Sequence, residues 1–451
     1  MLALARRLMP AAPALLAACW WAVLPTNFDA LYEVHLFATP FLLGTALLLT
    51  DDPGPWRRGW ALALALLATL LVRNETVFVL VLLVVGLAFA TRGRRWPLAA
   101  TAVPLLVVVL IAGLAYSRGV EKDGALRTRL EHRQKTALCQ HFAINYEQRH
   151  TDVKLNPFLS CRVLMKQTFG EEHPSFTTAW SENARAMAAF TAWHARLVPN
   201  GLQLGLFQAV WDHENPDFVA ADVGRGYAGV LSLLLLALLV AGGRALWLDR
   251  AEWGDELRRQ RLAWLALAAI GLGTLITCTF FVRPRPSFIF GLSAVVMLAA
   301  GLALSALARR YRLERVTAIA AIAVPVLLLA LLPVHYKPQS TPLADAYHRL
   351  RPFRDRIGTG ERFAMAPVAF GDDICFYLRP VRSCHVLNYF TIQTPDPARG
   401  LDAAGIKLLY ADPTLAANPA VARFIARPGR GWRVARSGVD QGRPWAVLVR
   451  S

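Results

Sequence analysis

Residues 26–35, TNFDALYEVH, form a short polar connector between two apolar runs. Within it, Asp29, Glu33 and His35 stand where a pair of membrane-spanning helices needs only a neutral turn. Ionisable groups are costly to hold at a membrane boundary, so their presence suggests a function. The connector is therefore the first place to look for a functional site, and the apolar runs around it decide the fold.

The composition is that of a polytopic membrane protein. The chain has 451 residues, of which 55% are hydrophobic and only 18% are charged. Its longer apolar runs reach about 18 to 22 residues, the length that a helix needs to cross the hydrocarbon core of a bilayer. The formal charge of +18 comes largely from arginines next to the apolar runs and not from a separate basic domain. We therefore expect a lipid bilayer around the chain and no nucleic-acid partner.

Nine apolar runs predict nine transmembrane helices, at residues 8–24, 31–50, 60–72, 76–90, 97–116, 227–241, 262–282, 287–307 and 317–332. The first is expected to be a retained signal anchor, because no small-residue cleavage site precedes Pro25 and further spans follow. The third and fourth runs are short, and the alternative is one long helix with Arg73 and Glu75 at its middle. Two helices are preferred, because these charges would be expensive inside hydrocarbon.

The arginines predict the orientation of the spans, because short cytoplasmic loops carry an excess of Lys and Arg. Arginine-rich segments fall in alternate connections: residues 6–7, 57–58, 92–95, 244–261 and 309–315. This alternation predicts a cytoplasmic N-terminus and an extracytoplasmic C-terminus. The membrane is expected to be the inner membrane of a bacterium. Arg73, Arg283 and Arg285 then lie in short outer loops, against the rule. Another requirement must keep them there, which makes them candidates for a function.

The topology divides the chain into four segments. Residues 1–116 hold the first five spans, residues 117–226 form a long extracytoplasmic loop, residues 227–334 hold the last four spans, and residues 335–451 are soluble and extracytoplasmic. In the loop, residues 125–141 and 181–197 predict helices, the second with Ser181 as its N-cap. These helices are either an ordinary packed insert or a lid over a substrate.

The last segment predicts a small α/β domain, because strand patterns alternate with helical ones. A helix is expected at residues 343–356, and strands at residues 362–367, 374–377, 405–410, 432–435 and 446–449. No glycine-rich phosphate loop or Ser/His/Asp signature is present there, so we interpret this domain as accessory.

Cysteine positions agree with the predicted topology. Cys139 and Cys161 lie in the long loop, and Cys375 and Cys384 lie in the C-terminal domain. Two local pairs in outer segments predict two disulfide bonds in an oxidising compartment, with four free thiols as the alternative. Neither CxxC nor HExxH spacing occurs and the histidines are scattered, so no structural metal site is expected.

The order of these features resembles the GT-C superfamily of polytopic glycosyltransferases, which use polyprenyl-phosphate sugars such as those of arabinose and mannose. Residues 32–35 (YEVH) look like the family's Glu-x-Arg-x-Tyr stretch at the head of a span. Residues 70–75 (LLVRNE) resemble its Lys/Arg-Pro-Glu break, and residues 281–286 (FVRPRP) resemble its Arg-Tyr-x-x-Pro break. The motifs are short, and their order along most of the chain is the stronger indication.

The chain departs from this family at its start. Family members normally begin with a span and a long outer loop that carries the acidic catalytic residue, whereas this chain would begin about two spans later. Either the start is missing, or Asp29 has taken the catalytic role in a shortened architecture, or the protein is no longer a transferase.

The resemblance implies transfer of a sugar from a polyprenyl-phosphate donor to a lipid or glycan acceptor on the extracytoplasmic face. An outer carboxylate, Asp29 or Glu33, would deprotonate or orient the acceptor hydroxyl, with His35 and Glu75 in support. A divalent metal would fit this chemistry, although no residue pattern fixes one. For Asp29 the alternative role is a helix cap, and for Glu33 it is an ion pair with Arg73 that holds spans together.

Basic side chains would neutralise the phosphate of the donor. Arg73, Arg283 and Arg285 are the expected phosphate ligands, because the guanidinium fork binds two oxygens at once. Anchoring of Arg283 and Arg285 to lipid headgroups is the alternative. At the level of the whole protein, the alternatives to a transferase are a transporter or flippase for a lipid-linked sugar and a non-catalytic protein of cell-envelope assembly.

Overall fold

The chain forms two compact units, Met1–His335 and Tyr336–Ser451, in a computed structural model. The structure describes residues 1–23, 34–72, 76–91, 97–122, 126–150, 161–214, 216, 223–331, 342–358, 362–366, 385–389, 396–440 and 442–451.

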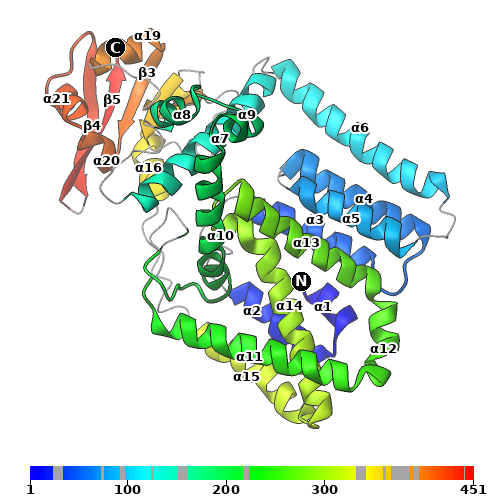
Figure 1. The fold of residues 1–451 in the computed structure, drawn as a ribbon. Helices are drawn as coiled ribbons and strands as arrows, with labels where there is room; N and C mark the ends of the chain where they lie inside the picture. Colours follow the sequence, from blue (N-terminus) through cyan, green and yellow to red (C-terminus); the bar gives the residue numbers. More distant parts are fainter. Residues whose placement is uncertain are drawn as a thin grey trace. The chain divides into compact units, whose positions relative to one another are not determined.

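The first unit is helical (Figure 1). Its helices before the long loop are α1 (Leu2–Leu8), α2 (Ala11–Val23), α3 (Val34–Leu48), α4 (Pro55–Leu67), the π-helical turn η2 (Ala68–Val72), α5 (Val77–Ala90) and α6 (Leu98–Lys122). The loop contributes α7 (Leu126–Arg149), α8 (Cys161–Phe169), α9 (Phe176–Glu182) and α10 (Ala184–Phe207). Then follow α11 (Gly226–Leu248), α12 (Arg250–Arg259), α13 (Arg261–Phe280), α14 (Pro286–Arg310) and α15 (Glu314–Leu331).

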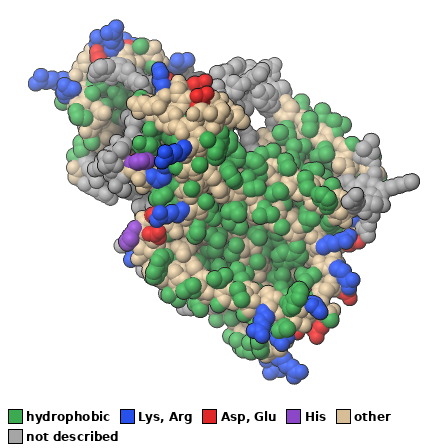
Figure 2. Space-filling view, in the orientation of Figure 1, with side chains coloured by type: hydrophobic (Ala, Val, Ile, Leu, Met, Phe, Trp, Pro, Cys, Tyr) green, Lys and Arg blue, Asp and Glu red, His purple; other side chains and the backbone are tan. Residues whose placement is uncertain are grey.

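Three stretches among the described residues are long and apolar enough to cross a membrane: Gly226–Leu248, Arg261–Phe280 and Phe288–Arg310. Shorter apolar helices cover Ala11–Val23, Thr39–Leu48, Val77–Ala90 and Ala99–Leu114. On α11, Leu233 is 68% exposed and Val240 is 65% exposed. Figure 2 shows hydrophobic side chains over much of the visible face of this unit. An apolar surface of this extent is typical of a protein that meets lipid, since water-soluble monomers expose only small apolar patches.

Among the described residues, three of the nine predicted spans have helices of spanning length, and the first predicted run is divided. The run at residues 8–24 is not one helix, because Met9 is extended and Pro10 separates α1 from α2. Proline cannot donate the helical hydrogen bond and disfavours helical geometry in the residue before it. The runs at residues 60–72 and 76–90 are two helices, as predicted. Thr69 Oγ1 and Thr76 Oγ1 lie 2.9 Å apart, whereas seven residues of one straight helix would separate their backbones by about 10 Å.

Three connections with arginine-rich segments meet at one end of the helical unit. The Asp51 carboxylate forms ion pairs with Arg7 Nη1 at 3.0 Å and with Arg259 Nη2 at 2.9 Å. Gln260 Nε2 donates to the same carboxylate at 2.9 Å. This cluster joins α1, the turn after α3 and the turn between α12 and α13, so three of the predicted cytoplasmic segments meet there. We call it the Asp51 end.

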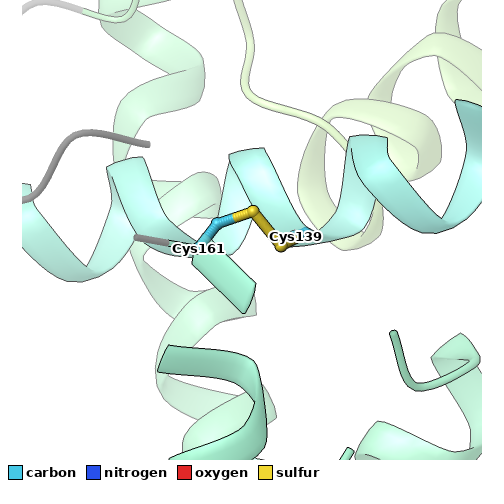
Figure 3. Close-up of a disulfide and its surroundings, with 2 residues drawn as sticks. All are labelled: Cys139 and Cys161. Atoms are coloured by element: carbon cyan, nitrogen blue, oxygen red, sulfur yellow. A yellow bond between two sulfur atoms is a disulfide. The ribbon is translucent and has the colours of Figure 1, made fainter. Parts of the chain in front are cut away.

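The helices of the long loop have a small core of their own, closed by a disulfide bond. Cys139 in α7 is bonded to Cys161 at the start of α8, with their Cα atoms 5.4 Å apart (Figure 3). Both cysteines are buried with Phe142, Met165 and other apolar side chains of α7 to α10. The first of the two predicted disulfide bonds is therefore confirmed, and Cys375 and Cys384 lie outside the described residues.

The N-cap of the second loop helix was predicted at the wrong residue. Ser181 lies inside α9, and α10 begins after Asn183, whose side chain accepts a hydrogen bond from Ala186 N at 3.0 Å. Asparagine satisfies the free amides of the first turn as well as serine does, so composition alone did not decide between them.

The second unit is a small α/β domain, as predicted. Its helices are α16 (Pro342–Leu350), η5 (Arg351–Phe353), α17 (Arg354–Gly358), α19 (Pro397–Ala403), α20 (Pro413–Ala416) and α21 (Pro419–Ala426). Its strands are β1 (Arg362–Ala366), β2 (His385–Asn388), β3 (Ile406–Ala411), β4 (Trp432–Asp440) and β5 (Arg443–Arg450). The sheet order is β2-β1-β3-β5-β4, with β2, β1 and β3 parallel and the β4–β5 hairpin antiparallel.

Side chains alternate across this sheet to give two cores. Leu409 and Leu448 pack on one face with α19, α20 and α21, whereas Leu408 and Val447 pack on the other face with α16 and α17. Successive residues of a strand point to opposite faces, so strands covered on both sides are apolar throughout. The predicted strand at residues 374–377 lies outside the described residues, and β2 was not predicted.

Candidate functional site

The turn between α13 and α14 presents the two arginines that the sequence singled out. It lies at the far end of α13 from the Asp51 end, about 30 Å away for a helix of this length. Arg285 N donates to Arg283 O at 2.8 Å, which closes a tight turn around Pro284. Arg285 is the extended N-cap residue of α14, and Pro286 is its first helical residue. The two prolines therefore fix the backbone on both sides of Arg285.

The helix α10 lies directly against this turn. An added Cβ on Gly201 would lie 1.9 Å from Pro284 O, so only a residue without a side chain permits this approach. Gly205, one turn further, faces Ser293 of α14, and Leu206 packs with Met297. Met297 is about 16 Å along α14 from its start. The second half of α10 is therefore packed along α14 inside the helical unit.

Arg283 and His194 are both buried where α10 meets the turn. Arg283 is 2% exposed and His194 is 0% exposed. Neither ring nitrogen of His194 has a hydrogen-bond partner within the described part of the chain. Burial, then the charge of Arg283 and then that of Arg149 lower the pKa of His194 to about 3. At neutral pH this imidazole is therefore uncharged, and the two arginines make the electrostatic potential around it positive.

The helix α7 completes the surroundings of His194. The ring of His141 lies 6.5 Å from that of His194 and 5.8 Å from that of Phe288, measured between centroids. Phe190, one turn before His194 in α10, has its ring 4.2 Å away. We call the group formed by Arg283, His194, His141, Arg149 and Phe288 the Arg283 site.

Arg149 is held in place from α7 by a buried amide. Its Nε donates to Asn145 Oδ1 at 2.7 Å, and Asn145 Nδ2 donates to Phe190 O at 2.9 Å. Asn145 is fully buried, and burial lowers the pKa of Arg149. A buried amide with both ends satisfied fixes α7 against α10, so the guanidinium of Arg149 keeps a defined position near His194.

Arg285 has a different environment from Arg283, although the sequence treated the two alike. Its guanidinium carbon lies 4.8 Å from the centre of the Phe288 ring, a cation–π arrangement, and the side chain is only half-buried. Arg283 therefore lies inside the site, and Arg285 lies at its margin.

The other predicted site residues are not placed by the structure. Asp29, Glu33, Arg73 and Glu75 lie outside the described residues. His35 is in the first turn of α3, and its side chain lies outside the described part of the molecule. The predicted meeting of these carboxylates with the phosphate ligands therefore lies outside the described residues.

The sequence interpretation missed His141, His194 and Arg149. Its only signal for them was helical spacing, since His141, Asn145 and Arg149 are four residues apart and share one face of α7. It also missed Glu214, whose Oε1 accepts from Arg196 Nη2 at 2.6 Å and whose Oε2 is buried. Asn200 Nδ2 donates to the backbone O of Glu214 at 3.0 Å, so both the backbone and the carboxylate of Glu214 contact side chains of α10.

Comparisons with protein-family models, with curated proteins and with solved structures find no match to this chain. Within the described residues, no group of three or more His, Cys, Asp or Glu side chains is arranged to hold a metal ion. The functional argument therefore depends on the Arg283 site itself.

Proposed function

We propose that the protein is an integral membrane glycosyltransferase that moves a sugar from a polyprenyl-phosphate donor to a lipid or glycan acceptor on the extracytoplasmic face. One observation carries the proposal: a buried arginine in a proline-stiffened turn, beside a neutral imidazole and a second arginine. A site with this charge, at the end of long apolar helices, suits an anionic group attached to a lipid.

Phosphate is the anion that this arrangement fits best. One guanidinium group can donate hydrogen bonds to two phosphate oxygens at once, and such charge-assisted hydrogen bonds are strong where water is excluded. Arg283 is rigidly presented by the turn, so it loses little side-chain and backbone freedom when the phosphate binds. Arg285, at the margin of the site, and Arg73 would contribute further positive charge.

The proposed topology has nine spans, with the Asp51 end in the cytoplasm of a bacterium and the Arg283 site outside. The disulfide bond between Cys139 and Cys161 supports this orientation, because such bonds persist in oxidising compartments. The helices that it joins pack with α10, which lies against the Arg283 turn. A reporter active only outside the cytoplasm should be active when fused after Ser451, and the opposite result would reverse the orientation.

In the proposed reaction, Asp29 or Glu33 accepts the proton of the acceptor hydroxyl. The hydroxyl oxygen then bonds to the anomeric carbon, and the bond from that carbon to the phosphate oxygen breaks with inversion. The leaving polyprenyl phosphate gains negative charge at this step. Arginine that binds this charge more strongly as it develops lowers the barrier, which is how electrostatic stabilisation accelerates a reaction.

The experiment measures transfer and phosphate binding in the same preparation. The protein in nanodiscs receives polyprenyl phosphates that carry labelled pentose or hexose, with membrane extract as the source of acceptor. We expect label in a new product, reduced at least about 100-fold by Arg283→Ala, the scale for loss of a charged group in a transition state. The control is Arg185→Ala, an exposed arginine of the same helix α10, which should transfer normally.

Two other outcomes would assign the protein to another class. Label that crosses the membrane of a proteoliposome while still attached to its lipid would indicate a transporter or flippase. Neither transfer nor transport, with phosphate-dependent binding absent, would leave a non-catalytic role in envelope assembly.

A further inference from the structure

We propose that His194 is a ligand of the lipid phosphate and that it takes up a proton when polyprenyl phosphate, the product of transfer, occupies the site. This inference rests on the proposed function and adds to it a residue from the long loop, which the sequence motifs did not indicate. It concerns how the site accommodates the second negative charge of the leaving phosphate.

The first argument is the state of the His194 ring. It is completely buried, and both of its nitrogens lack a hydrogen-bond partner in the described parts of the chain. Buried polar groups are nearly always hydrogen-bonded, because burying one without a partner costs free energy. A histidine left in this state within a cationic site indicates a ligand that supplies the missing contacts.

The second argument is the charge of the groups around the ring. Arg283 faces it from the turn before α14, and Arg149 acts on it from α7. His141, also from α7, contributes a second imidazole, whose ring centroid lies 6.5 Å from that of His194. Within α10, the ring of Phe190 packs against that of His194. The charged groups that act on His194 among the described residues are thus both cations, and they favour its neutral form.

A bound phosphate reverses this balance. The donor is a phosphodiester with one negative charge, whereas the product is a monoester with up to two, since its second pKa is about 6. Each negative charge near His194 raises the imidazole pKa, opposing the effects of burial and of the arginines. Transfer releases one proton from the acceptor hydroxyl to the Asp29 or Glu33 carboxylate for each monoester formed. That carboxylate returns the proton to solvent and His194 takes one from solvent, so charge and atoms balance overall.

The sign of the pH dependence follows from these states. In the empty site the pKa of His194 is about 3, so the ring is neutral at neutral pH. If the bound phosphate raises that pKa to about 7.5 or higher, the complex at about pH 7.5 holds about 0.5 to 1 proton more than its separated components. Binding then weakens by up to about tenfold per pH unit as the pH rises from the free-state pKa to the bound-state pKa, and above the bound-state pKa it no longer depends on His194 protonation. Between about pH 7 and 9 the ligand's own charge is nearly constant, because its second pKa is near 6.

The test uses farnesyl phosphate, a short polyprenyl monophosphate, with the full-length protein in nanodiscs. Calorimetry at about pH 7.5 in buffers of different ionisation heat gives the number of protons taken up, and a pH series gives the slope of the dissociation constant. We expect between about 0.5 and 1 proton per ligand for the wild type. His194→Gln and His194→Asn should bind more weakly and take up none. His141→Asn removes the other imidazole of the Arg283 site, and proton uptake that persists in this variant assigns the proton to His194 whatever the affinity. The matched control is His213→Asn, an exposed imidazole outside the site, which should keep both affinity and uptake.

The outcomes separate this inference from the function on which it rests. Phosphate-dependent binding without proton uptake, or uptake that persists in the folded His194 variants, would overturn the role of His194 and leave the proposed function intact. Farnesol binding as tightly as farnesyl phosphate would overturn both. Equal affinity for inorganic phosphate would overturn the assignment to a lipid ligand. If neither His194 variant folds, the wild type and His141→Asn decide: zero slope in the wild type refutes the inference, and equal non-zero slopes in both support it.

Discussion

The contact between Gly201 and Pro284 is the most sensitive structural feature of the Arg283 site. A Cβ at residue 201 would lie 1.9 Å from Pro284 O and 2.9 Å from Pro284 C, whereas ordinary contacts begin at 3.4 Å. In Gly201→Ala, α10 and the turn must therefore separate by about 1.5 Å, because both partners are backbone and neither can rotate away. Overpacking of a core typically costs about 1 to 3 kcal/mol, and a rigid backbone contact belongs at the upper limit.

We expect Gly201→Ala to lower the free energy of unfolding by about 3 kcal/mol, measured by SDS titration of the protein in mixed micelles. The matched control is Gly243→Ala in α11, where an added Cβ meets nothing within 4 Å. Alanine favours a helix over glycine by about 0.5 to 1 kcal/mol, so this control should be neutral or slightly stabilised. Gly205→Ala is intermediate, since the group in its way is the Ser293 hydroxyl, which can rotate.

The result that would refute this reasoning is equal stability of Gly201→Ala and Gly243→Ala. Such equality would mean that α10 is not packed on the Arg283 turn. His194 would then not be held next to Arg283, and the Arg283 site would lose its geometrical basis.

Two further predictions concern features outside the Arg283 site. The disulfide bond between Cys139 and Cys161, at a sequence separation of 22, should contribute about 3 kcal/mol to the free energy of unfolding through loop closure, and Cys139→Ser should lose this amount. Mass mapping of the wild-type protein without reductant should find the linked peptides, whereas two alkylated thiols would contradict the bond. At the Asp51 end, Asp51→Asn should lower the free energy of unfolding by about 1 to 2 kcal/mol, because two arginines lose their shared carboxylate. This decrease should become smaller in high salt, and a decrease that does not depend on salt would indicate a packing effect instead.

The helices of the first unit were predictable because their signals are local. Apolar length alone identified the runs that became α11, α13 and α14, and the polar break before Thr76 correctly divided α4 from α5. The break at Pro10 was missed because the whole run is apolar. Proline does not interrupt an apolar run, although it interrupts the hydrogen bonds of a helix. In the second unit, β3 and β5 were recognised by their β-branched and apolar residues, whereas the short β2 carries little pattern of its own.

The place of α10 was less predictable. Its sequence includes Asn200 and Gln203, so it reads as a helix of the outer loop and not as part of the apolar bundle. In the structure these polar side chains are satisfied, Asn200 by Glu214 O and Gln203 by Ser232 Oγ at 2.9 Å, which allows the helix to pack beside α14. These hydrogen-bond partners lie 14 and 29 residues away along the chain, so a local sequence pattern does not predict them.

The sequence by itself determined that this is a helical membrane-type chain with a C-terminal α/β unit, a local disulfide bond and two arginines in a stiff turn. These conclusions follow from apolar length, strand alternation and proline geometry, which act over a few residues. Only the tertiary structure decided that Arg283 is buried while Arg285 is at the margin, and that His194 and Arg149 converge near Arg283 from two other helices. Burial and electrostatic fields depend on which distant segments meet, so side chains of ordinary type acquire their special states only when α7, α10 and the Arg283 turn pack together.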